Sequence, residues 1–201
     1  MEQYMRRVLE LAEKGIGNVN PNPLVGALVV RDGKVIAEAY HERYGKAHAE
    51  ARALEVAGEE ARGADLYVNW EPCVSYPGKG TPPCADKIIE CGIARVILGA
   101  IDPTPEVNGR GIEQLRKAGI DVIEGLLQSE CEALNEIRAK YATAKLPFVL
   151  LKMAMTADEL TTLLKDAFPD AELRIDDLAG DGDHYRAVIR SSAFEGKSRV
   201  A

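Results

Sequence analysis

The sequence predicts an α/β fold in which a mixed β-sheet is flanked by helices in three layers. Strand-like and helix-like segments alternate over the first three quarters of the chain, which is typical of layered α/β domains. The apolar run 24–30 and the segment 34–40 are joined by Asp32-Gly33, a dipeptide typical of tight hairpin turns. This hairpin makes one part of the sheet antiparallel, so the sheet as a whole is mixed.

The spacing of apolar residues predicts the other elements. Residues 1–14 carry apolar side chains at helical intervals, and Gly15 provides a stop. The elements expected after the hairpin are a helix over 48–58, a strand over 65–70, a helix over 84–92, a strand over 94–100, a helix over 112–118, a strand over 120–125, a helix over 128–144 and a strand over 147–154.

Length and charge limit the classes of protein. The 201 residues allow one full domain with a remainder, or two small domains. With 32 acidic and 25 basic residues, the net charge of −7 argues against a general binder of nucleic acid or membrane surfaces. The apolar runs fall far short of the ~20 residues that cross a bilayer. The first residues form an amphipathic pattern rather than a secretory signal, so we expect a cytoplasmic protein.

The character of the sequence changes near Met155. Residues 1–154 are expected to form the main domain, and residues 155–201 a second segment. In this segment the pattern predicts a helix over 158–167 and strands over 172–177 and 185–191, separated by an acidic, glycine-rich turn. One helix and two strands make a thin core, which is marginal when it stands alone.

Four cysteines occur, at positions 73, 84, 91 and 131. In an acidic chain without a secretory signal, clustered cysteines indicate a metal or catalytic role, and isolated ones indicate packing. Cys91 and Cys131 fall within predicted helices, so we expect both to pack in the core.

The motif His48-Ala49-Glu50, together with Cys73 and Cys84, indicates a catalytic zinc site. One imidazole and two thiolates suit zinc and leave a fourth position open for water. Glu50 is placed to move protons, as in the H-x-E and P-C-x-x-C signature of zinc deaminases. The second cysteine departs from this signature, because ten residues separate Cys73 from Cys84. The ligand set therefore requires that the loop between them folds back.

Several long segments of the sequence resemble a known family. The segments NPNPLVGALVVRDGKVIAEAYHERYGKAHAEARAL, GKGTPPCADKIIECGIARVILGAIDPTPEVNGRG and LPFVLLKMA are similar to the deaminase domain of the bifunctional riboflavin-biosynthesis deaminase/reductase. The resemblance covers residues 1–154 and implies a cytidine-deaminase-like fold. It also implies hydrolytic deamination of 2,5-diamino-6-ribosylamino-4(3H)-pyrimidinone 5′-phosphate, a pyrimidine ribonucleotide. His48, Cys73 and Cys84 would bind zinc, and Glu50 would be the proton shuttle.

The resemblance also implies a set of substrate contacts. The matching positions are Asn22, His41, Lys79 and Asp102, with Thr104 at a position where asparagine is usual. Two of them have a structural alternative, since Asn22 can shape its turn and Asp102 can cap its loop. The loop between the cysteines is two residues longer than is common in the family. Members of the family often associate, so a homo-oligomer is possible.

From Met155 onward the sequence resembles the BolA family, whose members bind monothiol glutaredoxins around an iron–sulfur cluster. The segment ends before that family's C-terminal histidine ligand, so a glutaredoxin partner is not expected. The reductase domain of the bifunctional enzyme is also not expected from this chain. Two alternatives to the enzyme stay open: a BolA-like partner module on an inactive deaminase scaffold, and deamination of a base in nucleic acid. The acidic balance argues against the second.

Overall fold

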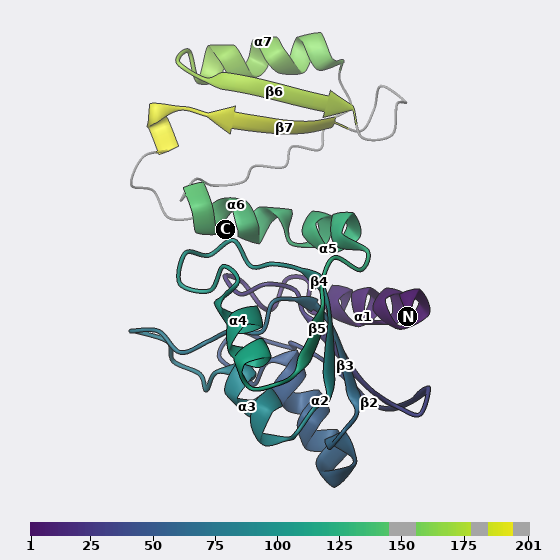
Figure 1. Cartoon of the computed structure of the whole chain (residues 1–201). Coiled ribbons are helices and arrows are strands. Elements are labelled where there is room, and N and C mark those ends of the chain that lie inside the picture. The colour runs from purple at the N-terminus through teal and green to yellow at the C-terminus, as the bar shows by residue number, and fades with distance from the viewer. Residues whose placement is uncertain (145–155, 178–184, 195–201) are drawn as a thin grey trace. The chain divides into compact units, whose positions relative to one another are not determined.

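The chain forms two compact units, residues 1–143 and 144–201, in a computed structural model (Figure 1). The structure describes residues 1–144, 156–177 and 185–194. The predicted strand over 147–154 and the glycine-rich turn over 178–184 lie outside the described residues. The domain boundary between residues 154 and 155 stays a prediction.

The first unit is built on a five-stranded sheet. Its strands are β1 (Gly26–Arg31), β2 (Lys34–Tyr40), β3 (Asp65–Trp70), β4 (Arg95–Ala100) and β5 (Asp121–Ile123), in the order β2-β1-β3-β4-β5. β1 pairs antiparallel with both β2 and β3, whereas β3, β4 and β5 are parallel. Asp32 (φ 50°) and Gly33 (φ 72°) make the turn between β1 and β2. The predictions of a mixed sheet and of its hairpin are confirmed.

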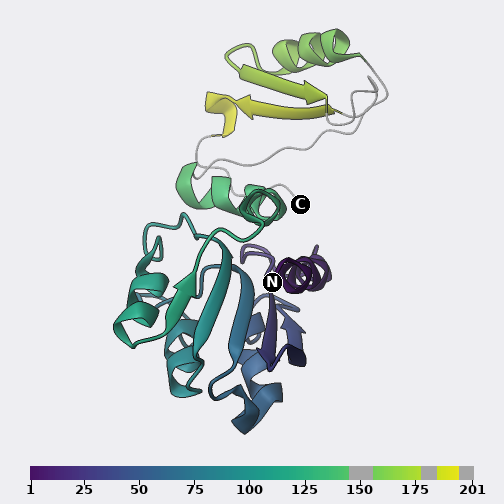
Figure 2. The same cartoon turned by 45° about the vertical axis from the view of Figure 1, so that its right-hand side comes forward.

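Helices cover both faces of this sheet (Figure 2). One face packs against α1 (Glu2–Glu13) and α5 (Gln128–Leu134), and the other against α2 (Ala49–Ala57), α3 (Cys84–Glu90) and α4 (Arg110–Lys117). A 3-10 turn, Gly58–Ala61, follows α2, and α6 (Glu136–Ala144) follows α5. The helices and strands predicted between residues 48 and 125 are all present, with small differences at their ends.

α1 lies directly against β1 because a glycine allows it to. A Cβ atom on Gly26 would lie 2.2 Å from the carbonyl oxygen of Val8. The apolar stripe of α1 is buried by this contact, including Met5, Val8 and Leu11. The helical spacing in the first residues therefore identified the face that packs on the sheet.

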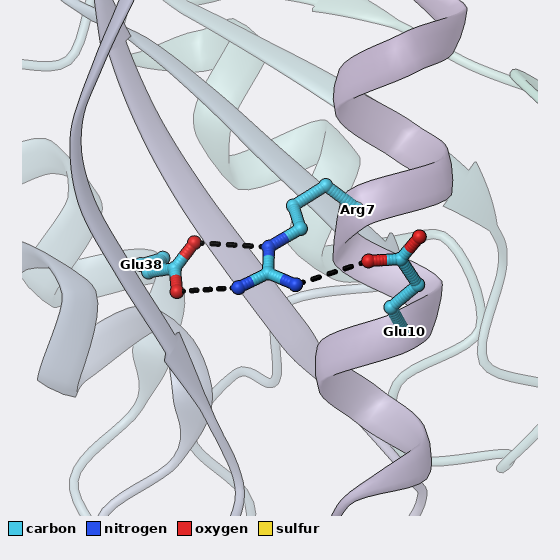
Figure 3. A network of polar contacts seen from close by, with 3 residues as sticks. All are labelled: Arg7, Glu10 and Glu38. Atoms are coloured by element: carbon cyan, nitrogen blue, oxygen red, sulfur yellow. Dashed lines mark hydrogen bonds and ion pairs between the residues drawn. The ribbon is translucent and has the colours of Figure 1, made fainter.

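An ion network ties the exposed side of α1 to the edge strand β2 (Figure 3). The Arg7 guanidinium donates to both carboxylate oxygens of Glu38, at 2.7 and 3.1 Å, and to Glu10 at 3.0 Å. The hydrogen bonds from Arg7 lower the pKa of the Glu38 carboxyl. Such exposed pairs are screened by water, so we assign this network to orientation of the helix rather than to stability.

One predicted helix is interrupted in the structure. The expected helix over 128–144 is two helices, α5 and α6, which are separated at Asn135. The buried Asn135 side chain accepts a hydrogen bond from the Leu24 N–H at 2.7 Å and donates to the Leu24 carbonyl at 3.0 Å. Asn69 donates to the same carbonyl at 2.9 Å. This long-range pairing with Leu24 is not visible in local apolar spacing.

The second unit contains α7 (Ala157–Ala167), the antiparallel strands β6 (Glu172–Asp177) and β7 (Tyr185–Arg190), and a 3-10 turn at Ser192–Phe194. The predicted helix and both strands are confirmed. Thr156 and Glu159 form a reciprocal capping box at the start of α7. Leu160 and Leu164 belong to a small apolar cluster with residues of both strands. Among the described residues, no helix combines the length and apolar character needed to span a membrane.

We predict that Asn135→Ala lowers the free energy of unfolding of the first unit by about 1–3 kcal/mol, because the Leu24 N–H loses its acceptor and the Leu24 carbonyl keeps only the donor from Asn69. Trp70, the single tryptophan, is buried in this unit and reports its unfolding in urea by fluorescence. Asn18→Ala, at an exposed turn, is the matched control and should change the value by less than about 0.5 kcal/mol. Equal effects of the two variants would contradict this role of Asn135.

Candidate active site

The predicted metal ligands come together at the ends of two helices that lie side by side (Figure 1). His48 is the N-cap residue of α2, and Cys84 is the first residue of α3. Cys73 lies in the loop that follows β3, three residues after the strand ends. The Ala85 N–H donates to the Cys73 carbonyl at 3.1 Å, and the Cys84 N–H donates to the Cys73 sulfur at 3.4 Å. The loop therefore folds back, as the ligand set required.

The three ligand atoms fit a zinc ion. The Nδ1 atom of His48 lies 3.5 Å from the Cys73 sulfur and 3.3 Å from the Cys84 sulfur. All three atoms lie within 4.8 Å of one another. Two ligands of one tetrahedral zinc, with Zn–N near 2.0–2.1 Å and Zn–S near 2.3 Å, are separated by roughly 3.5 Å. The nitrogen–sulfur distances match this value, and the donor set is the one that zinc prefers.

The polar surroundings prepare one of the thiols for metal binding. Hydrogen bonds from Cys84 and His48 lower the pKa of the Cys73 thiol to about 3. The same interaction with Cys73, together with burial, raises the pKa of Cys84. Although burial lowers the pKa of His48, the hydrogen bond with Cys73 and the charge of Glu50 raise it above its usual value. The thiolate form that a metal requires is therefore already favoured at Cys73.

Glu50 lies in the first turn of α2 and is almost fully buried. Its Oε2 atom has no hydrogen-bond partner. Burial raises the pKa of this carboxyl, against the opposing charge of His48. An unpartnered carboxyl oxygen beside the ligands is able to take up and release a proton.

A cavity of about 320 Å³ opens beside these groups. Seven of the nine residues predicted for the site line it: Asn22, His48, Glu50, Cys73, Lys79, Asp102 and Thr104. The other two contact this set. Cys84 touches His48, and His41 pairs with Asn22. Sequence reasoning thus identified residues that lie together, while their roles toward a substrate stay predictions.

His41, a predicted substrate contact, is buried and does not itself line the cavity. Its Nδ1 lies 3.2 Å from the Ala47 carbonyl, and its Nε2 lies 3.1 Å from Nδ2 of Asn22. Because Ala47 can only accept and the Asn22 amide nitrogen can only donate, Nδ1 carries the proton. Burial lowers the pKa of His41, which keeps the ring neutral. His41 therefore fixes the orientation of the Asn22 amide.

Lys79 and Asp102 approach the cavity from two different loops. Lys79 donates to the Thr81 hydroxyl at 2.9 Å and lies 5.8 Å from the centre of the Tyr76 ring. Asp102 is buried, and its Oδ1 accepts hydrogen bonds from both the N–H and the hydroxyl of Thr104. Asp102 therefore caps its loop, which is the structural role given above as the alternative to substrate binding. This cap does not remove Asp102 from the cavity wall.

Sequence reasoning missed Glu71, which stands directly after β3 and before Pro72-Cys73. Its buried carboxylate accepts backbone N–H groups of Asp102 at 3.2 Å, Gly109 at 2.9 Å and Gly111 at 2.8 Å. Burial raises the pKa of Glu71, while these hydrogen bonds lower it. One signal in the sequence could have indicated it: an acidic residue directly after a buried strand needs hydrogen-bond partners, because burying a charge without them costs free energy.

The chain also matches known proteins. Residues 1–100 match the family model of the cytidine and deoxycytidylate deaminase zinc-binding region. A diaminohydroxyphosphoribosylamino-pyrimidine deaminase of Buchnera aphidicola is 44% identical over 133 residues, which are 66% of this chain and 89% of that protein.

The chain belongs to the diaminohydroxyphosphoribosylaminopyrimidine deaminase family.

Longer members of this family match as well. The riboflavin biosynthesis protein RibD of Actinobacillus pleuropneumoniae is 52% identical over 155 residues, 77% of this chain and 41% of that protein. The crystal structure of a deaminase/5-amino-6-(5-phosphoribosylamino)uracil reductase from Thermotoga maritima aligns with a TM-score of 0.71 and 51% identity, covering 78% of this chain and 45% of that one. The chain thus spans less than half the length of these two relatives.

Family membership confirms the predicted cofactor class and the cytidine-deaminase-like fold. The chain carries a zinc-binding region of the deaminase type, with His48, Cys73 and Cys84 as its triad. The family model and the three relatives give no support to the predicted resemblance of residues 155–201 to the BolA family. What the structure shows in this segment is a helix and a two-stranded hairpin.

We predict that Glu71→Ala weakens zinc binding by about 10-fold, because leaving backbone N–H groups beside the Pro72-Cys73 corner without an acceptor costs about 1–3 kcal/mol. The backbone N–H groups of Asp102, Gly109 and Gly111 would lose their acceptor, and the segment packed beside the Pro72-Cys73 corner would lose these contacts. Competition with a chelating dye measures the affinity. Glu90→Ala, an exposed carboxylate on α3, should bind zinc like the unchanged chain. Normal affinity in Glu71→Ala would show that the corner does not depend on this carboxylate.

Proposed function

We propose that this chain catalyses the hydrolytic deamination of 2,5-diamino-6-ribosylamino-4(3H)-pyrimidinone 5′-phosphate, the deaminase step of riboflavin biosynthesis. The observation that carries the proposal is the buried Glu50 beside the His48, Cys73 and Cys84 triad, facing one polar cavity. The matching relatives support the choice of substrate, since their names describe this deaminase. A reductase step is not proposed for this chain.

The residues of the chain divide the chemistry between them. His48, Cys73 and Cys84 would hold zinc, which when bound supplies a Lewis acid that lowers the pKa of water. Glu50 takes a proton from that water and delivers protons to the ring nitrogen and to the departing amine. The water oxygen replaces the exocyclic nitrogen on the ring carbon, and ammonia leaves. The raised pKa of Glu50 suits a group that has to hold the proton between these steps.

Recognition of the substrate would fall to the polar cavity wall. Asn22, held by His41, presents an amide to the ring or the ribose. Asp102, fixed by Thr104, is a hydrogen-bond acceptor for amino or hydroxyl groups. Lys79 offers a positive charge for a phosphate or a ring oxygen. Thr104 itself uses both of its donors on Asp102, so we propose that it positions that carboxylate.

The alternatives gain no support from these observations. A BolA-like module on an inactive scaffold would not need a complete zinc triad beside a buried glutamate with one free carboxyl oxygen. A nucleic-acid base as substrate fits poorly with the net charge of −7. The cytoplasmic location and the homo-oligomer both stay predictions.

We predict that the purified, zinc-loaded chain releases ammonia from the diaminopyrimidine ribonucleotide, and that removing zinc with a chelator abolishes the release. Coupling ammonia to glutamate dehydrogenase gives the rate. Cytidine and single-stranded RNA serve as control substrates and should release none. Ammonia from RNA but not from the ribonucleotide would replace the proposed substrate by a nucleic acid.

We predict that Glu50→Gln lowers kcat by at least about 100-fold while zinc stays bound, because the amide cannot carry the proton. Metal analysis of the same sample shows that the triad is intact. Glu55→Gln, on the exposed side of α2, is the control for the substitution itself. A Glu50→Gln protein with the unchanged rate would remove Glu50 from the proton path.

A further inference from the structure

Arg138 is a cation in the wall of the cavity that neither the sequence motifs nor the proposed mechanism uses. It lies on α6, and its side chain lines the same cavity as Lys79 and Asp102. Its Nη2 atom donates to the Thr104 hydroxyl at 2.9 Å. The break at Asn135 precedes it by three residues, so the new helix α6 starts just before this contact.

The hydrogen bonding of this guanidinium is incomplete. Its Nη1 atom is buried and has no hydrogen-bond partner. In the part of the chain that the structure describes, Arg138 forms no ion pair with a carboxylate. A buried donor without an acceptor costs free energy, and a buried charge is ordinarily paired. An acceptor that comes from outside the chain would complete the site.

Thr104 explains how Arg138 is held in place. The hydroxyl of Thr104 accepts from Arg138 and donates to Oδ1 of Asp102, so the three side chains form one directed chain of hydrogen bonds. Asp102 Oδ1 also accepts the Thr104 N–H at 2.8 Å, which fixes the threonine. One edge of the guanidinium is thereby anchored at the cavity wall, and the other donors are left for a ligand.

We propose that Arg138 binds the phosphate of the ribonucleotide substrate. This inference rests on the proposed function and extends it to one recognition residue. Guanidinium groups bind phosphate oxygens through paired, charge-assisted hydrogen bonds, and they stay charged when partly buried. The carboxylates that line the cavity, Glu50, Glu71 and Asp102, would repel a phosphate placed beside them. Arg138 supplies an unpaired positive charge for it.

The test compares the substrate with its dephosphorylated ribonucleoside in the full-length, zinc-loaded chain. We expect Arg138→Met to raise KM for the phosphorylated substrate by about 10-fold or more, with kcat little changed, and to leave KM for the ribonucleoside unchanged. Arg138→Lys should recover part of the loss. Lys117→Met removes the same charge at an exposed position of α4 outside the cavity and should have no effect.

Two controls keep the outcome unambiguous. Arg138→Gln keeps a donor for Thr104 without the charge, and it replaces Arg138→Met if that variant loses its fold or its zinc. An equal change in KM for both substrates, or no change for either, overturns the proposal while the deaminase activity stands. If the unchanged chain releases no ammonia, the proposed function fails instead. Calorimetric titration with ribose 5-phosphate then decides: weaker binding by the variant supports the role of Arg138, and equal binding or none overturns it.

Discussion

The site depends on the hydrogen bonds that the Glu71 carboxylate accepts from the backbone. Glu71 directly follows β3, and its carboxylate accepts three backbone N–H groups from the loop after β4 and the first turn of α4. Both carboxylate oxygens therefore hold the segment that carries Asp102, and the backbone of Glu71 leads directly into Pro72 and Cys73. Gly111 allows the close approach, since a Cβ there would lie 2.2 Å from the Pro72 carbonyl oxygen. Glu71 in this way links the segment that carries a zinc ligand to the cavity wall that carries Asp102.

The site combines two kinds of environment within one small cavity. At the triad, sulfur and nitrogen atoms lie at distances that suit a zinc ion, and the Glu50 carboxyl lies beside them with one oxygen that has no hydrogen-bond partner. Farther along the wall, polar side chains are held in pairs, His41 with Asn22 and Thr104 with Asp102. Pairing of this kind holds polar side chains in place before any ligand binds, which reduces the entropy lost on binding. This division agrees with the proposed deamination, in which protons move at the triad and the substrate is recognised along the wall.

The sequence predicted elements and ligands well where the signal was local. Period-two and helical patterns located the strands and most helices, and the H-x-E and cysteine motifs located the triad. It failed where a residue acts across the chain. The break at Asn135 comes from hydrogen bonds to Leu24, which lies 111 residues away, and no local pattern carries that pairing. Glu71 and Arg138 were missed for the same reason, because their partners belong to other loops and helices.

The pairing of Asn135 with Leu24 also bears on the order in which the first unit assembles. Leu24 lies two residues before β1, and its N–H and carbonyl groups both form hydrogen bonds with Asn135, near the end of the unit. A chain emerging from the ribosome has to expose nearly the whole unit before this contact forms. Contacts of such large sequence separation slow folding, because the entropy of closing a long loop is lost before the contacts stabilise the chain. The deaminase unit is therefore expected to become native late in its own synthesis, after α5 has emerged.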